Sequence, residues 1–241
     1  MKNSLHGFRH FNRQYFNKNC LFLFKNRRMR YWLFGVLSCF IFSFVGAQNI
    51  KPKASFHVNF GLPINLQNES FNGIMQGLLN TSAHFQYTLE NALCFGIGVN
   101  YSYFTLNEFK ISEANKGAIL MPSGFVKVGH EKFHTSNFGT DIGLKMGYTM
   151  NLFKSDSIVI NEGKLRQVGS LYFEPNAGVM LTIDDRTTIK FAVGYVIQDF
   201  GFQPTMIGLS SNAGYDPLKF KTRTQYITIG FGYTHYFKSK R

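Results

Sequence analysis

The chain has 241 residues, with 26 Lys or Arg against 13 Asp or Glu, and an aromatic load of 27 Phe, 12 Tyr and one Trp. An apolar content of 44% excludes a disordered chain, and three cysteines are too few for a disulfide scaffold. Residues 1–47 hold eight basic residues and no acid, so the rest of the chain carries 18 basic against 13 acidic residues. That small excess does not indicate a nucleic-acid partner.

The first 47 residues have the order of a secretory signal peptide. Arg27, Arg28 and Arg30 precede the uncharged run WLFGVLSCFIFSFV, and small residues follow it up to Ala47. Fourteen residues of helix measure roughly 21 Å, which is short of a hydrocarbon core of about 30 Å. We therefore predict cleavage between Ala47 and Gln48 rather than a membrane-spanning helix.

Two start sites fit this reading. Residues 1–28 make an unusually long basic region, and translation starts either at Met1 or at Met29. Once residues 1–47 are removed, Cys94 is the only cysteine, so no intramolecular disulfide is expected in residues 48–241.

The exported part alternates between apolar and polar residues. In residues 137–150, Ile142 and Leu144 alternate with Gly143 and Lys145, which is the period of a strand with one apolar face. Eight segments show this pattern to varying degrees, namely 53–62, 81–91, 93–105, 124–130, 137–150, 170–183, 187–199 and 225–237.

The connections alternate in length. The short ones are residues 91–92, 131–136 and 184–186, and the long ones are residues 63–80, 106–123, 151–169 and 201–224. In an up-and-down sheet this puts every long connection at one end. The sequence predicts an all-β fold, an eight-stranded antiparallel up-and-down transmembrane β-barrel with short periplasmic turns and long external loops in the outer membrane.

The direction of the apolar faces decides between two barrels. A lipid-embedded barrel turns Phe85 and Ile97 outward and keeps Gln86 and Asn100 inside. A soluble, lipocalin-like barrel that binds a ligand would do the reverse. The apolar faces are continuous and often aromatic, while the other faces are rich in Gly, Asn, Ser and Thr, so we favour the membrane barrel.

Five charged residues fall on the predicted inward face. They are Lys127, Asp141, Lys145, Glu174 and Lys190. These residues could line a path for ions. In so narrow a barrel we expect them instead to pair and fill the interior, because a lone buried charge is costly.

The last strand resembles the closing strand of outer-membrane barrels. Phe231, Tyr233 and Phe237 provide its alternating apolar residues and its near-terminal aromatic residue, and four further residues, Lys238-Ser239-Lys240-Arg241, depart from that pattern. The resemblance implies recognition by the barrel assembly machinery. Residues 48–241 resemble the small outer-membrane β-barrel proteins of Bacteroidetes, including the PorT-like group, which implies a role in surface interaction or secretion.

No catalytic or cofactor site is expected. His134 and Ser136, with Glu131 nearby, have the spacing seen in barrels that deacylate lipid A, but they fall in a predicted periplasmic turn. His57 and His84 lie on inward faces of neighbouring strands, and two histidines without a third ligand are weak evidence for a metal site. We predict no enzyme activity, no cofactor and no metal, with a lipid-modifying enzyme as the alternative.

The long loops are the segments expected to bind partners. Residues 62–80 are spaced partly as an amphipathic helix, which would lie at the membrane surface or act as a lid or docking segment. The expected partners are outer-membrane lipid and an envelope protein bound through these loops.

Overall fold

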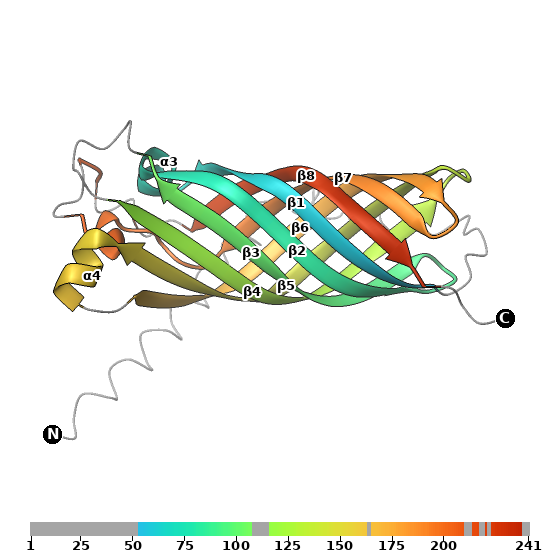
Figure 1. Cartoon of the computed structure of the whole chain (residues 1–241), viewed down its shortest axis with the longest axis horizontal. Helices are drawn as coiled ribbons and strands as arrows, with labels where there is room; N and C mark the ends of the chain where they lie inside the picture. Colours follow the sequence, from blue (N-terminus) through green and yellow to red (C-terminus); the bar gives the residue numbers. More distant parts are fainter. Residues whose placement is uncertain are drawn as a thin grey trace, which may run out of the picture. The chain divides into compact units, whose positions relative to one another are not determined.

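The described residues form a sheet of eight strands that closes on itself (Figure 1). The computed structural model describes residues 53–107, 116–162, 165–209, 214–216, 220 and 223–237. The predicted signal peptide, including Ala47 and Gln48, lies outside them. The strands are β1 (Lys53–Gln67), β2 (Met75–Thr88), β3 (Leu93–Leu106), β4 (Gly117–Phe133), β5 (Phe138–Ser155), β6 (Arg166–Asp184), β7 (Thr187–Gln198) and β8 (Thr224–Tyr236).

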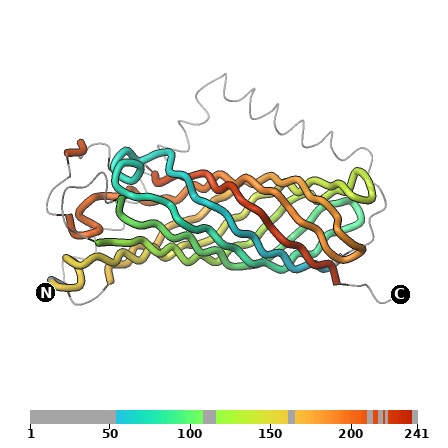
Figure 2. Tube along the Cα trace, turned by 45° about the horizontal axis from the view of Figure 1, so that its top comes forward, coloured from blue at the N-terminus to red at the C-terminus, as the bar shows by residue number. Residues whose placement is uncertain are grey.

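Each strand pairs antiparallel with the next, and β1 pairs with β8. The closing register runs from Ser55 opposite Tyr236 to Gln67 opposite Gln225. Because the sheet has no free edge, backbone N–H and C=O groups find partners within the wall, as lipid requires. Figure 2 shows the strands winding obliquely around the barrel axis. The predicted fold is confirmed.

The apolar residues point outward through most of the wall. Phe85 is 58% exposed and Ile97 is 66% exposed, whereas Gln86 and Asn100 are buried inside. This is the orientation predicted for lipid, and it excludes the soluble ligand-binding alternative, which needs these apolar side chains inside.

The strands extend well into the segments predicted as long loops. The described helices are α3 (Glu69–Ile74), α4 (Asp156–Glu162) and the 3-10 helix η1 (Pro204–Ile207). Both α3 and α4 lie at the same end of the barrel, where the long connections gather (Figure 1). We call this the external end. No helix in the described ranges is long and apolar enough to cross a membrane.

The amphipathic helix predicted within residues 62–80 forms only in part, as α3. Ile64 belongs to β1 and faces outward, and a register shift in β2 leaves both Leu78 and Leu79 substantially exposed. Only six residues are helical, and α3 buries Phe71 and Ile74 beneath it. The helix-like spacing of the whole segment therefore combines the ends of two strands, the short helix α3 and a bulge.

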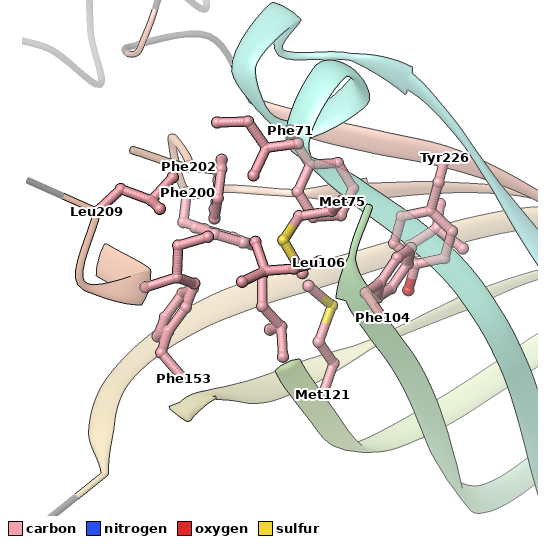
Figure 3. Close-up of a cluster of buried hydrophobic side chains, with 14 of the residues drawn as sticks. Phe71, Met75, Phe104, Leu106, Met121, Phe153, Phe200, Phe202, Leu209 and Tyr226 are labelled. Carbon is pink, nitrogen blue, oxygen red and sulfur yellow. The ribbon is translucent and has the colours of Figure 1, made fainter. Parts of the chain in front are cut away.

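The interior is polar through much of its length and apolar at the external end. There the inward positions of the strands carry large apolar side chains, and α3, η1 and the β7–β8 connection close over them (Figure 3). We call this group the mouth cluster; it includes Phe71, Phe104, Met121, Phe153, Phe202 and Tyr226. The inward faces, predicted to be rich in Gly, Asn, Ser and Thr, therefore carry large apolar side chains at this end.

Candidate functional site

The barrel interior brings the five predicted charged residues together. Lys127 lies on β4, Asp141 and Lys145 on β5, Glu174 on β6 and Lys190 on β7. All five are buried. Their inward direction follows from the strand alternation, because the neighbours of each residue point outward; all of these neighbours are apolar except Thr140 beside Asp141.

Asp141 holds two lysines. The Lys127 Nζ lies 2.8 Å from both carboxylate oxygens of Asp141, and the Lys190 Nζ lies 2.9 Å from Oδ2. These charge-assisted hydrogen bonds join β4, β5 and β7 across the lumen. The aspartate is therefore the centre of an ion cluster that crosses the interior.

The ion pairs form away from the like-charged residues that lie directly opposite each other on β4 and β5. In the β4–β5 register Lys127 lies opposite Lys145, and Glu131 lies opposite Asp141. Like charges directly opposite destabilise a strand pair. The long Lys127 side chain instead reaches Asp141, four residues from its opposed position on β5. Lys127 turns toward Asp141, while Lys145 turns to β6 and binds Glu174 at 2.8 Å.

The second ion pair lies toward the mouth cluster. The Lys145 ammonium also lies 5.1 Å from the centre of the Phe125 ring, and the Tyr172 hydroxyl donates to Glu174. A cation close to an aromatic ring gains further stabilisation when it is shielded from water. The pair thus joins the polar interior to the apolar cluster above it.

Glu131 is the residue whose position was predicted incorrectly. It was expected in a turn at residues 131–136, but β4 continues to Phe133 and Glu131 is buried in the interior. It shares the inward phase of Lys127, four residues earlier, and that phase is the signal that could have placed it. It accepts a hydrogen bond of 2.8 Å from the Tyr236 hydroxyl.

Gln86 joins Glu131 to the ion cluster. Its amide oxygen accepts from Lys127 Nζ at 2.8 Å, and its amide nitrogen donates to Glu131. The hydrogen-bonded chain therefore runs from Tyr236 through Glu131, Gln86 and Lys127 to Asp141. The alternation along β2 places Gln86 inside, whereas its bridging role depends on contacts with other strands.

His57 and His84 stack inside the barrel. Their ring centres are 4.5 Å apart with an angle of 6° between the planes. His57 is held by Thr234 at 2.8 Å and by Ser55 at 2.9 Å. Both ring nitrogens of His57 are engaged by hydroxyls, and the described residues contain no group of three metal-ligating side chains. The two rings thus come together as a stacked pair inside the barrel.

Buried polar side chains from all eight strands project into the described interior. A small cavity of about 30 Å³ lies beside Lys145, Glu174 and Gly194. That is room for about two water molecules. The histidine pair lies next to both the polar and the apolar groups, since the His57 Nε2 is 3.9 Å from the Glu131 Oε2 and the His84 ring centre is 5.8 Å from that of Phe125.

The residues considered for lipid deacylation are kept apart. His134 and Ser136 lie exposed in the turn after β4, and the His134 ring bonds the Thr140 hydroxyl at 2.9 Å. Glu131 is buried inside and bonds Tyr236 and Gln86. The three groups form no cluster.

The predicted assembly residues lie on the outer wall. Phe231 and Tyr233 on β8 face outward, and Phe237 follows the strand end with its ring stacked 6.5 Å from that of Phe85. All three predicted assembly residues are therefore exposed on the outside of the barrel.

No protein-family model and no curated protein matches the chain. Several solved structures are similar in fold. Neisserial surface protein A is 9% identical with a TM-score of 0.46, over 77% of this chain and 97% of that one. Ail of Yersinia pestis, in complex with the heparin analogue sucrose octasulfate, is 11% identical with a TM-score of 0.45, over 78% and 100%. The N-terminal β-barrel domain of Pseudomonas aeruginosa OprF is 12% identical with a TM-score of 0.38, over 79% and 98%.

The wall of this barrel establishes its compartment. Large apolar side chains from every strand are exposed on the outside, and charged side chains from β4 to β7 are buried inside. Water would not stabilise such a surface, whereas a bilayer does. An antiparallel closed barrel with an outward apolar band is the arrangement of outer-membrane proteins, and the protein is located there.

Proposed function

We propose that this protein is a closed outer-membrane barrel that conducts no solute and acts through its external end, as a structural or surface-interaction protein of the cell envelope. The same proposal places it among the PorT-like barrels of Bacteroidetes, with a role associated with secretion or envelope functions. The pattern of the closing strand and the Gly-aromatic composition support that finer assignment.

One observation carries the proposal. Asp141 binds both Lys127 and Lys190, so side chains from three strands meet within the lumen. An eight-stranded barrel has an interior just wide enough for its side chains. Breaking this cluster would leave buried charges without partners, which makes an open state costly.

The external end is the part left for partners. The mouth cluster seals it from within, while Asn72 on α3 and Thr205 on η1 are exposed there. Connections carried on a rigid barrel are suited to binding, because the scaffold fixes their positions. Biogenesis would additionally require the barrel assembly machinery, through the outward face of β8.

Conductance tests the closed interior. The purified, folded protein is inserted into a planar lipid bilayer, and current is recorded in concentrated potassium chloride. We expect no steady single-channel current from the native chain. A stable ohmic conductance from correctly folded protein would contradict the closed interior.

Cross-linking tests the role of the external end. A photoreactive residue replaces Asn72 or Thr205 in intact cells, with Thr140 near the short turns as the matched position at the other end. We expect a reproducible envelope-protein adduct from the external positions and not from position 140. Adducts from position 140 alone, or from none of the three, would count against a surface-interaction role.

A further inference from the structure

A groove of about 570 Å³ crosses the outer wall over β2, β3, β4 and β5. Ala83 and Gly124 lie along its floor, and Tyr101, Tyr148 and Met150 are among the side chains around it. Ala83 lies opposite Val99, and Val99 lies opposite Gly124, which in turn lies opposite Tyr148. The groove therefore follows one row of outward-facing residues across the four strands.

Two glycines shape it. A Cβ added at Gly124 would meet no atom within 4 Å, so the missing side chain leaves open space on the outer surface. The Tyr148 hydroxyl occupies the position that a Cβ on Gly169 would take. The tyrosine therefore leans toward β6 and away from Gly124, which widens the groove.

A positive charge lies above the groove toward the external end. Met150, Leu152 and Lys154 are successive outward residues of β5, and Lys154 is exposed. Four residues separate Met150 from Lys154, or about 13 Å along the strand. The nearby Asp156 carboxylate accepts from the Lys116 backbone N–H at 3.4 Å, so it is engaged with the loop.

The size and lining of the groove fit one small apolar ligand. Sites for single small molecules measure about 300–1,000 Å³ and are lined mainly by apolar and aromatic side chains. The available ligand at this depth is lipid, and a cation at the external edge favours an anionic head group. We propose that the groove holds an acyl chain of an anionic lipid of the outer leaflet, with the phosphate at Lys154. This site is independent of the role proposed for the external end.

Lipid retention tests the site. The full exported chain is purified in detergent with dioleoyl phosphatidylglycerol as the anionic probe and dioleoyl phosphatidylcholine as the neutral one, and bound lipid is counted by native mass spectrometry. Gly124→Leu puts a large side chain into the groove, at a position where an added Cβ meets no atom within 4 Å. Ala177→Leu, on the outward face of β6, is the matched control. Heat-shifted gel mobility verifies that each variant is folded.

We expect the native chain and Ala177→Leu to retain phosphatidylglycerol, and Gly124→Leu to lose most of it. Lys154→Gln should lower retention of the anionic lipid about five-fold relative to the neutral lipid, and Lys154→Arg should not. If Gly124→Leu does not fold, Ala83→Leu repeats the test from the other side of the floor. Equal retention by the groove-filled variant and Ala177→Leu would overturn the proposal, as would a native dimer that Gly124→Leu dissociates.

Discussion

Lys127 and Asp141 form a diagonal ion pair between β4 and β5, with the lysine Nζ 2.8 Å from both carboxylate oxygens. The directly opposed residues in this register are Lys127 with Lys145 and Glu131 with Asp141. Each of these charged side chains is therefore stabilised by an ion pair or hydrogen bond to a residue other than the one directly opposite on β4 or β5. The charged residues of the interior depend on one another for these contacts.

Removing the central carboxylate should strongly destabilise the barrel. Asp141→Asn leaves Lys127 and Lys190 buried without their carboxylate, and losing one partner of a buried pair costs about 3–5 kcal/mol. Guanidinium unfolding in lipid vesicles measures the loss. Asp185→Asn changes an exposed carboxylate in the β6–β7 turn and should stay within about 0.5 kcal/mol. Similar values for the two variants would contradict the network.

The bridging amide can be tested separately. Gln86→Leu removes the group that accepts from Lys127 and donates to Glu131. Lys127 keeps Asp141 and Glu131 keeps Tyr236, so the expected cost is that of lost hydrogen bonds to charged groups, about 1.5–3 kcal/mol. Gln76→Leu, exposed at the external end of β2, is the control. The free energy of unfolding should fall for Gln86→Leu alone; an unchanged value would show that Gln86 does not bridge.

The mouth cluster should contribute stability through packing. Phe104→Ala deletes a fully buried ring that lies 5.0 Å from Phe71 and 5.1 Å from Tyr226, measured between ring centres. A loss of about 3–5 kcal/mol is expected. Tyr103→Ala, on the outward side of the same strand, should cost less. The reverse order in unfolding experiments would contradict an apolar cluster inside the barrel.

A charge placed on the wall should be costly only in lipid. Val126 is 49% exposed near the middle of β4. Val126→Lys should cost about 2–4 kcal/mol in vesicles, as expected for a lysine near the bilayer midplane. Ile160→Lys on α4, where the native side chain is already 81% exposed, should change stability by less than about 0.5 kcal/mol. A neutral Val126→Lys would indicate that water, not lipid, covers the wall.

The number of strands, their order and the direction of their side chains could be predicted from the sequence, because regular patterns specify them. Alternation with period two put Ile142 outside and Asp141 inside, and the unequal connections ordered the strands. The ends of the strands could not be predicted as well. Near the external end Phe104 is buried and Tyr103 faces outward, so both faces of β3 are apolar. The alternation between apolar and polar residues that marks a strand is therefore missing there.

The partners within the interior were also beyond sequence reasoning. Periodicity puts Lys127 and Asp141 on the same side of the wall, but the diagonal contact depends on the register between strands. Glu131 was assigned to a turn because its neighbours in sequence are polar, although its phase matches that of Lys127. Side-chain reach across the lumen then decides that Gln86 bridges the two.

Tryptophan fluorescence tests the orientation of the wall most directly. The only tryptophan of the chain is Trp32, within the predicted signal peptide, so a single tryptophan can be placed at outward Phe85 or Phe191 and at inward Phe104 or Tyr172. In vesicles with brominated acyl chains, we predict strong quenching of Phe85→Trp and Phe191→Trp, and weak quenching of Phe104→Trp and Tyr172→Trp. Stronger quenching at the two inward positions than at the two outward ones would contradict the account.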